Sequence, residues 1–170
     1  TNQLEDPRTF KYDGFNRLKK LRYPVAAVGA NASSTSDYEE YGYDAAGNRV
    51  SERRRDGLMI AKSYDVLGRL RFIDKPGTEL DVTNSYDNFN NLVSASQTDS
   101  TVSWDYDVFS RATRETTDLG VVSYTYDTAG RRTRVSPSGA GVKQYSYLDD
   151  GQLSLVGPSE YPVYASYYYD

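Results

Sequence analysis

The sequence predicts an all-β protein built from repeated antiparallel hairpins, and three observations predict it. The pair Tyr-Asp recurs at a nearly constant step, because successive copies from Tyr43 onward lie 21, 22, 20, 20, 21 and 22 residues apart. A fixed period of this kind is typical of repeat architectures. The chain contains 17 Tyr but only five Phe and one Met, a composition that fits pleated strands better than packed helices. Most copies continue as Asp-x-x-Gly or Asp-x-x-Asn, which is a turn pattern.

The repeated motif spans seven residues and has the consensus Tyr-Asp-x-x-Gly-Arg-Leu, whose positions we number one to seven. The copy at Tyr147 is degenerate, since Leu148 separates its Tyr from Asp149. A final Tyr-Asp pair stands at Tyr169-Asp170. The residues that define the motif, as structural positions, are Tyr12, Asp13, Tyr43, Asp44, Gly47, Tyr64, Asp65, Gly68, Tyr86, Asp87, Tyr106, Asp107, Tyr126, Asp127, Gly130, Tyr147, Asp149 and Gly151.

Positions two to five of the motif predict the tight corner of a hairpin. Asp suits the first position of a type I turn, where its side chain can accept hydrogen bonds from nearby backbone N–H groups. Gly or Asn three residues later reaches positive φ at low cost. A type I turn followed by a left-handed residue is a common hairpin connection with a β-bulge. Ser110 is the weakest copy, because Ser tolerates this conformation less well.

The strand that enters each corner alternates, with aromatic residues two positions apart on one face, as in Tyr124 and Tyr126. Lys62 and Asn84 interrupt this pattern, so we expect them to meet solvent or a polar neighbour. A second turn signal halfway through most copies, such as Asp56-Gly57, gives two strands per repeat. We expect strands of about eight residues, or about 25 Å.

The chain from 1 to 170 is expected to form a single YD-repeat array, as a fragment of a longer one. Strand twist and the repeated bulges predict that the ribbon coils into a spiral or shell segment. A compact sandwich is the alternative. The small-residue segment 24–37 is expected to be an inserted surface loop without structure of its own.

Composition excludes several classes of function. The chain has no Cys and no His, which removes disulfides, thiolate nucleophiles and the usual zinc sites. Its net charge of −4 provides no basic footprint for nucleic acid, and no apolar run approaches the length of a membrane span. The recurring Asp is explained by its turn and is too sparse for calcium. We therefore expect no cofactor, no metal, no nucleic-acid partner and no membrane insertion.

The recurring YDxxGR(L) and YDxxGNR segments, 20–22 residues apart over nearly the whole chain, resemble the Rhs/YD-repeat family. The resemblance implies a β-ribbon that spirals into a hollow shell around a C-terminal polypeptide, often a toxin. Such shells occur in bacterial Rhs proteins and in the C components of insecticidal toxin complexes, and teneurins carry a similar one for adhesion. The chain departs from the family in lacking a DPxGL-like cleavage pattern, since Asp6-Pro7 is an isolated dipeptide.

We therefore expect a non-catalytic shell segment, secreted or at a bacterial cell surface. Its expected partners are neighbouring YD repeats and a cargo toxin polypeptide. The alternative is a carbohydrate-binding or adhesion module, because exposed aromatic rings can stack on sugar rings. Its candidate residues are Trp104, Tyr124 and Tyr145.

Overall fold

The computed structural model describes residues 7–25, 31–158 and 165–167, and every regular element in them is a β-strand. The 15 strands pair antiparallel with their sequence neighbours, in the order β1 to β15. The prediction of an all-β antiparallel hairpin ribbon is therefore confirmed. The chain divides into two compact units, Thr1–Thr83 and Asn84–Asp170. The single array remains a prediction, and so does coiling into a shell.

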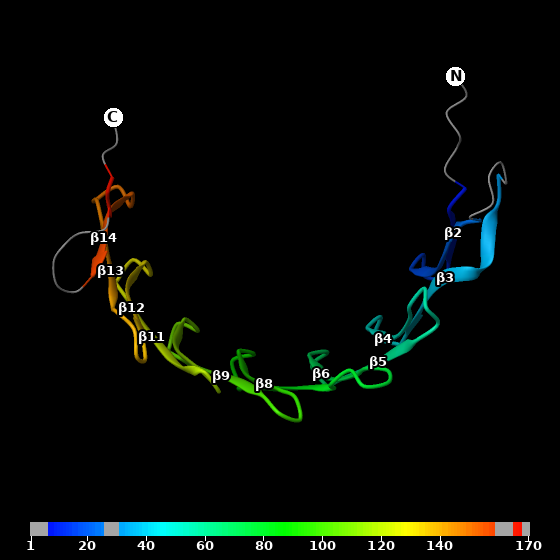
Figure 1. Cartoon of the computed structure of the whole chain (residues 1–170), viewed down its shortest axis with the longest axis horizontal. Coiled ribbons are helices and arrows are strands. Elements are labelled where there is room, and N and C mark those ends of the chain that lie inside the picture. Colours follow the sequence, from blue (N-terminus) through cyan, green and yellow to red (C-terminus); the bar gives the residue numbers. More distant parts are fainter. Residues whose placement is uncertain (1–6, 26–30, 159–164, 168–170) are drawn as a thin grey trace, which may run out of the picture. The chain divides into compact units, whose positions relative to one another are not determined.

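Each unit is a succession of hairpins (Figure 1). The first unit contains β1 (Thr9–Tyr12), β2 (Leu18–Pro24), β3 (Ser33–Tyr43), β4 (Arg49–Arg53), β5 (Met59–Tyr64) and β6 (Leu70–Asp74), while β7 (Val82–Tyr86) spans the boundary. The second unit contains β8 (Leu92–Ser96), β9 (Thr101–Tyr106), β10 (Ala112–Thr117), β11 (Gly120–Tyr126), β12 (Arg132–Pro137), β13 (Lys143–Tyr147), β14 (Leu153–Pro158) and β15 (Ala165–Ser166).

The motif forms the predicted corners, which we call YD turns. In the first copy, Asn16 N–H donates to the Asp13 carbonyl at 3.1 Å, and Asp13 N–H donates to the Arg17 carbonyl at 2.9 Å. A bulge interrupts the register just before Tyr12 and recurs at the corners that follow Tyr43, Tyr64, Tyr106, Tyr126 and Tyr147. Position five has positive φ in each of the seven copies that the structure describes, at Asn16, Gly47, Gly68, Asn90, Ser110, Gly130 and Gly151. In both units the YD turns stand out from the sheet as short hooks (Figure 1).

Two expectations, one about strand length and one about segment 24–37, were wrong. Most strands have five to seven residues rather than eight, because the YD turn and the second turn consume much of each repeat. Segment 24–37 is not wholly a loop, since Ser33–Asp37 forms the first part of β3 and Ser33 pairs with Pro24. The ion pair of Arg55 with Asp37, at 2.6 Å, fastens this part of the strand. Residues 26–30 lie outside the described residues.

The register gives the sheet of the second unit two unlike faces. Trp104 pairs with Glu115, Tyr124 with Val135 and Tyr145 with Val156. These pairs share one face, because directly opposed residues and residues two apart point the same way. We call it the aromatic face, and it carries Val93, Val102, Trp104, Tyr106, Val122, Tyr124, Tyr126, Val135, Tyr145, Tyr147 and Val156. The opposite face is mostly polar, with Ser103, Arg114, Ser123, Thr125, Arg134 and Gln144.

No hydrophobic side chain is fully buried among the residues that the structure describes. Each unit is therefore held together by strand pairing and by contacts between successive repeats, as in quasi-one-dimensional repeat proteins. The polar contacts that join one copy of the motif to the next are accordingly a major part of what fixes the geometry.

Candidate functional site

In six of the seven YD turns that the structure describes, the Asp at position two holds the turn closed. Asp107 Oδ1 accepts hydrogen bonds from the backbone N–H groups of Phe109 and Arg111, at 2.9 and 3.0 Å. Asp107 Oδ2 accepts from Arg111 Nε at 2.7 Å. The N–H of position six bonds the Asp Oδ1 in the same way at Asp13, Asp44, Asp65, Asp87 and Asp127. This supports the role that the sequence predicts for Asp in the turn.

These bonds shift the ionisation of the carboxyl group. The pKa of Asp107 is lowered from its ordinary value, because Arg111 and the backbone N–H groups bond the charged form, although burial acts in the opposite direction. The pKa of Asp65 is lowered for the same reasons, with the backbone bond from Arg69 as the largest contribution. The turn carboxylates are therefore charged and engaged at neutral pH.

The Arg at position six also reaches the next copy, which the sequence did not reveal. The Arg111 guanidinium lies 4.7 Å from the centre of the Tyr126 ring, and its Nη1 donates to the Asp127 carbonyl at 3.2 Å. Arg17 contacts Tyr43 and Arg131 contacts Tyr147 in the same way, at 4.4 and 4.7 Å. A single guanidinium thus closes its own turn and stacks on the next ring.

The Tyr of the motif adds a second link in the opposite direction. The Tyr126 hydroxyl donates to the Ala112 carbonyl, at position seven of the preceding copy, at 2.7 Å. The equivalent bonds of Tyr43, Tyr64, Tyr106 and Tyr147 measure 2.8 to 2.9 Å. We call the combined contact between two copies a joint. Tyr12, which belongs to the first copy, is 56% exposed.

Two of the joints that the structure describes lack the guanidinium. Position six is Asn48 in the second copy and Asn91 in the fourth, and each amide Nδ2 still donates to the Oδ2 of its own Asp, at 2.9 and 2.8 Å. Asn is too short to cover the next ring, and within the described part of the chain no cation lies over Tyr64 or Tyr106. These joints keep the turn and the hydroxyl bond alone.

The degenerate copy keeps the fold of the turn with different residues. Leu148, rather than Asp149, takes position two, since Leu148 N–H donates to the Gln152 carbonyl at 2.8 Å and Gly151 N–H donates to the Leu148 carbonyl at 2.9 Å. Asp150 Oδ1 accepts from Gln152 N–H at 3.0 Å. Asp149 therefore lies at position three, one residue past the place of the Asp in the other copies.

A hollow of about 290 Å³ opens in the second unit at the joint between the fourth and fifth copies. Its floor belongs to the aromatic face and its sides belong to two YD turns. It is lined by Asp87, Phe89, Asn91, Val93, Trp104, Asp105, Tyr106, Asp107 and Val108. Trp104 Nε1 donates to Glu115 Oε2 at 3.1 Å, which fixes the indole at the edge of this hollow.

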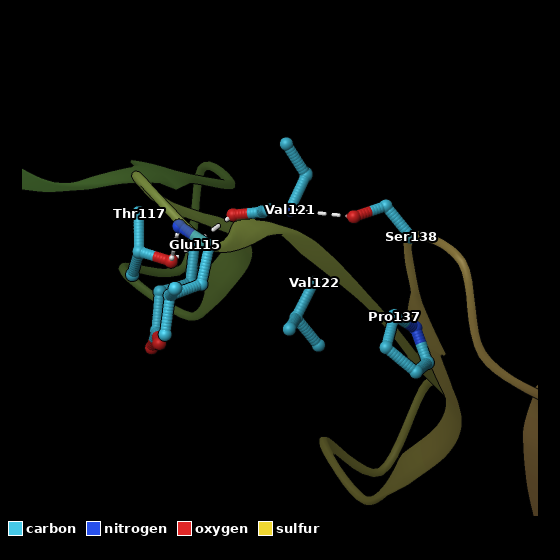
Figure 2. A pocket seen from close by; sticks show the side chains of 8 residues that line it. Glu115, Thr117, Val121, Val122, Pro137 and Ser138 are labelled. Carbon is cyan, nitrogen blue, oxygen red and sulfur yellow. Dashed lines mark hydrogen bonds between the residues drawn. The ribbon is translucent and has the colours of Figure 1, made fainter.

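A smaller hollow of about 150 Å³ lies at the turn between β10 and β11, and its apolar lining includes Val122 and Pro137 (Figure 2). Its two hydroxyls are engaged with the turn backbone: Val121 N–H donates to Ser138 Oγ at 2.8 Å and Leu119 N–H donates to Thr117 Oγ1 at 3.2 Å. Glu115 is the one carboxylate in its lining. The hollow therefore results from the packing of the turn and presents little free polar chemistry.

The three candidate carbohydrate-binding residues share the aromatic face of the second unit. Trp104, Tyr124 and Tyr145 lie on β9, β11 and β13, so neighbouring candidates are about 10 Å apart at roughly 4.8 Å per strand. The Arg132 guanidinium lies 4.8 Å from the centre of the Tyr124 ring. A sugar would have to compete with this cation for that ring face.

Among the described residues no group of three or more acidic side chains could hold a metal ion. No helix in the same residues has the length and hydropathy needed to cross a membrane.

No protein-family model matches the chain, and no curated protein has a matching sequence. Three solved structures of TcdB2-TccC3 are similar in fold: one with Cdc42, one with TEV and one without the hypervariable C-terminal region. Each has a TM-score of 0.68 over 86% of this chain, at 15, 14 and 16% sequence identity respectively. This chain spans 9% of the length of those chains. The chain therefore shares its fold with a segment of TcdB2-TccC3.

Proposed function

We propose that this chain is a non-catalytic wall segment of a YD-repeat shell, which encloses a C-terminal cargo polypeptide in a secreted or cell-surface Rhs-type protein. Its mechanism is physical exclusion, because a cargo behind a continuous sheet meets neither targets nor proteases. The similarity in fold to TcdB2-TccC3 over 86% of the chain is the observation that carries the proposal. One of the similar structures was solved without a hypervariable C-terminal region, the position at which we place the cargo.

The joints suit a wall. Every described strand pairs with its sequence neighbours, so the sheet presents no gap along its hydrogen-bonded direction. Arg111, Tyr126 and Asp127 tie one repeat to the next through side chains as well as through the backbone. Such a wall can be lengthened by adding copies, since each new repeat brings its own joint.

The recurring carboxylates support a structural rather than a catalytic role. Asp107 accepts three hydrogen bonds within its own turn, which leaves it little capacity to act as a base or nucleophile. The same arrangement is distributed over successive copies instead of being concentrated at one place.

Limited proteolysis of the full-length protein tests the proposal. The cargo segment is expected to resist protease in the intact protein and to be degraded once mild denaturant opens the wall. A cargo released as a separate domain, outside any shell, serves as the control for intrinsic protease resistance. Cleavage of the cargo at equal rates in the intact protein and in the released form would rule out enclosure.

Carbohydrate binding remains the second candidate, favoured by the shared face and regular spacing of Trp104, Tyr124 and Tyr145. The chain contains one Trp, so its emission reports directly on this face. A panel of polysaccharides is expected to change Trp104 emission in a saturable way if the face binds sugar. No change across the panel would eliminate this candidate and leave the wall proposal untouched.

A further inference from the structure

The hollow beside Trp104 repeats, without a guanidinium, a cage that other copies fill with their own Arg. In the first copy, Arg17 lies 5.1 Å from the centre of the Phe15 ring at position four and 4.4 Å from the ring of Tyr43. In the fifth copy, Arg111 lies 5.1 Å from the Phe109 ring and 4.7 Å from the Tyr126 ring. Two independent copies therefore hold a guanidinium between the same pair of aromatic positions.

The fourth copy has both rings but not the cation. Phe89 occupies position four and Tyr106 begins the next copy, and both line the 290 Å³ hollow. Position six is Asn91, whose amide is turned back to its own Asp87. Phe89 is 81% exposed, so the cage is open to solvent.

We propose that this hollow binds the arginine side chain of a polypeptide partner. The planar guanidinium would lie between Phe89 and Tyr106, as Arg17 lies between Phe15 and Tyr43. Its donors would meet the Asp107 carbonyl, because the equivalent carbonyls of Asp44 and Asp127 accept from Arg17 and Arg111 at 3.4 and 3.2 Å. The binding geometry is thus taken from two joints of the same chain.

The composition of the hollow fits a cation rather than an anion or an apolar group. Its lining includes Asp87, Asp105 and Asp107 and, within the described residues, no basic side chain. The Trp104 indole adds the aromatic system that attracts cations most strongly. Arginine fits better than lysine, because its planar guanidinium can stack on an aromatic ring while its N–H groups donate hydrogen bonds in the plane of the guanidinium.

Trp104 emission provides the assay, since it is the one Trp of the chain and lines the hollow. The 170-residue chain is titrated with the tripeptide acetyl-Gly-Arg-Gly-amide. Matched peptides carry citrulline, which keeps the shape but not the charge, or lysine, which keeps the charge but not the plane. We expect a saturable change with arginine and at least about tenfold weaker binding with citrulline. We expect lysine to bind more weakly than arginine. Equal binding of arginine and citrulline, or of arginine and lysine, would overturn the proposal.

A variant and its matched control locate the binding. Asn91→Arg supplies the chain's own guanidinium to the cage and is expected to weaken arginine-peptide binding at least about tenfold. Asn48→Arg makes the same substitution at a joint outside the hollow, so it adds the same charge but is expected to leave binding unchanged. Phe89→Ala removes one exposed ring and is expected to weaken binding while the circular dichroism spectrum stays constant. If both Arg variants weaken binding equally, the effect is general charge repulsion and the assignment to this hollow is wrong.

Discussion

Replacing Arg111 with Asn is the sharpest test of the joints, because the chain itself makes this substitution at Asn48 and Asn91. Those amides keep the bond to the turn Asp at 2.9 and 2.8 Å. The substitution Arg111→Asn should therefore leave the fifth turn closed. It removes the contacts that the guanidinium makes with the next copy, namely the stack on Tyr126 and the bond to the Asp127 carbonyl.

The magnitude follows from these two contacts. The stack at 4.7 Å lies on a partly exposed side chain and contributes about 0.5–1 kcal/mol. The hydrogen bond to the Asp127 carbonyl at 3.2 Å contributes about 0.5–1.5 kcal/mol. We therefore expect the free energy of unfolding to fall by about 1–2.5 kcal/mol, and the melting temperature by about 2–4 °C for each kcal/mol in a chain of this length.

Urea unfolding followed by circular dichroism and by Trp104 emission measures the loss, and Trp104 lies on β9, directly before the fifth turn. The matched control is Arg134→Asn on the polar face, where Arg134 Nε donates to Ser136 Oγ within its own strand at 2.9 Å. The control is expected to change stability by less than about 0.5 kcal/mol. If the two variants unfold at the same urea concentration, the guanidinium contributes nothing at the joint and our account of it fails.

Three further expectations concern the same region. Tyr126→Phe keeps the ring but loses the 2.7 Å bond to the Ala112 carbonyl, and should lower the free energy of unfolding in urea by about 0.5–1.5 kcal/mol; an unchanged midpoint would contradict this. Because the pKa of Asp107 is lowered, its stabilisation is present above the ordinary Asp value of 3.8 and is lost as the pH falls through the lower folded value. Thermal melts of Asp107→Asn should therefore depend less on pH in that acid range than melts of the parent chain, and parallel curves would refute the assignment. Ser110 has a φ of 59°, which is unfavourable for a residue with a Cβ, so Ser110→Gly should raise the free energy of unfolding in urea by about 1 kcal/mol. A lower free energy of unfolding in the variant would show that the Ser side chain compensates for the strain.

Local chemistry made the corners predictable from the sequence. Asp13 and Asn16 stand three residues apart, and this spacing alone specifies a type I turn that ends in a left-handed residue. The weak copy at Ser110 adopts the same positive φ, so strand pairing on both sides imposes the conformation where the residue does not favour it. The interruption at Lys62 was also interpreted correctly, because its Nζ lies 3.4 Å from Glu52 Oε2.

The joints were not predictable in this way, because their partners are set by register. Arg was visible at position six, but the ring that Arg111 meets is 15 residues further along the chain, on the far side of a complete strand pair. The bulge and the conformation of the fifth YD turn bring the Arg111 guanidinium and the Tyr126 ring together. The extension of β3 over Ser33–Asp37 was missed for a related reason. Its small polar residues carry no strand pattern of their own, and pairing with β2 and the ion pair to Arg55 decide their conformation.

The joint chemistry explains why position six, of all motif positions, can change the surface without disturbing the fold. Asp at position two bonds the turn backbone, and the Tyr hydroxyl is bonded to the preceding copy, so replacing either removes a contact that fixes the geometry of the repeat. Arg at position six bonds the Asp of its own turn and contacts the Tyr ring of the next copy. Asn at this position keeps the bond to the Asp but does not reach the ring. A copy with Asn therefore folds as its neighbours do but leaves the following ring uncovered. In a repeat protein stabilised by nearest-neighbour contacts, the loss of stability caused by one weaker joint is confined to the repeats that it connects. Asn at position six can therefore leave an aromatic ring uncovered in one repeat while the other repeats keep their contacts.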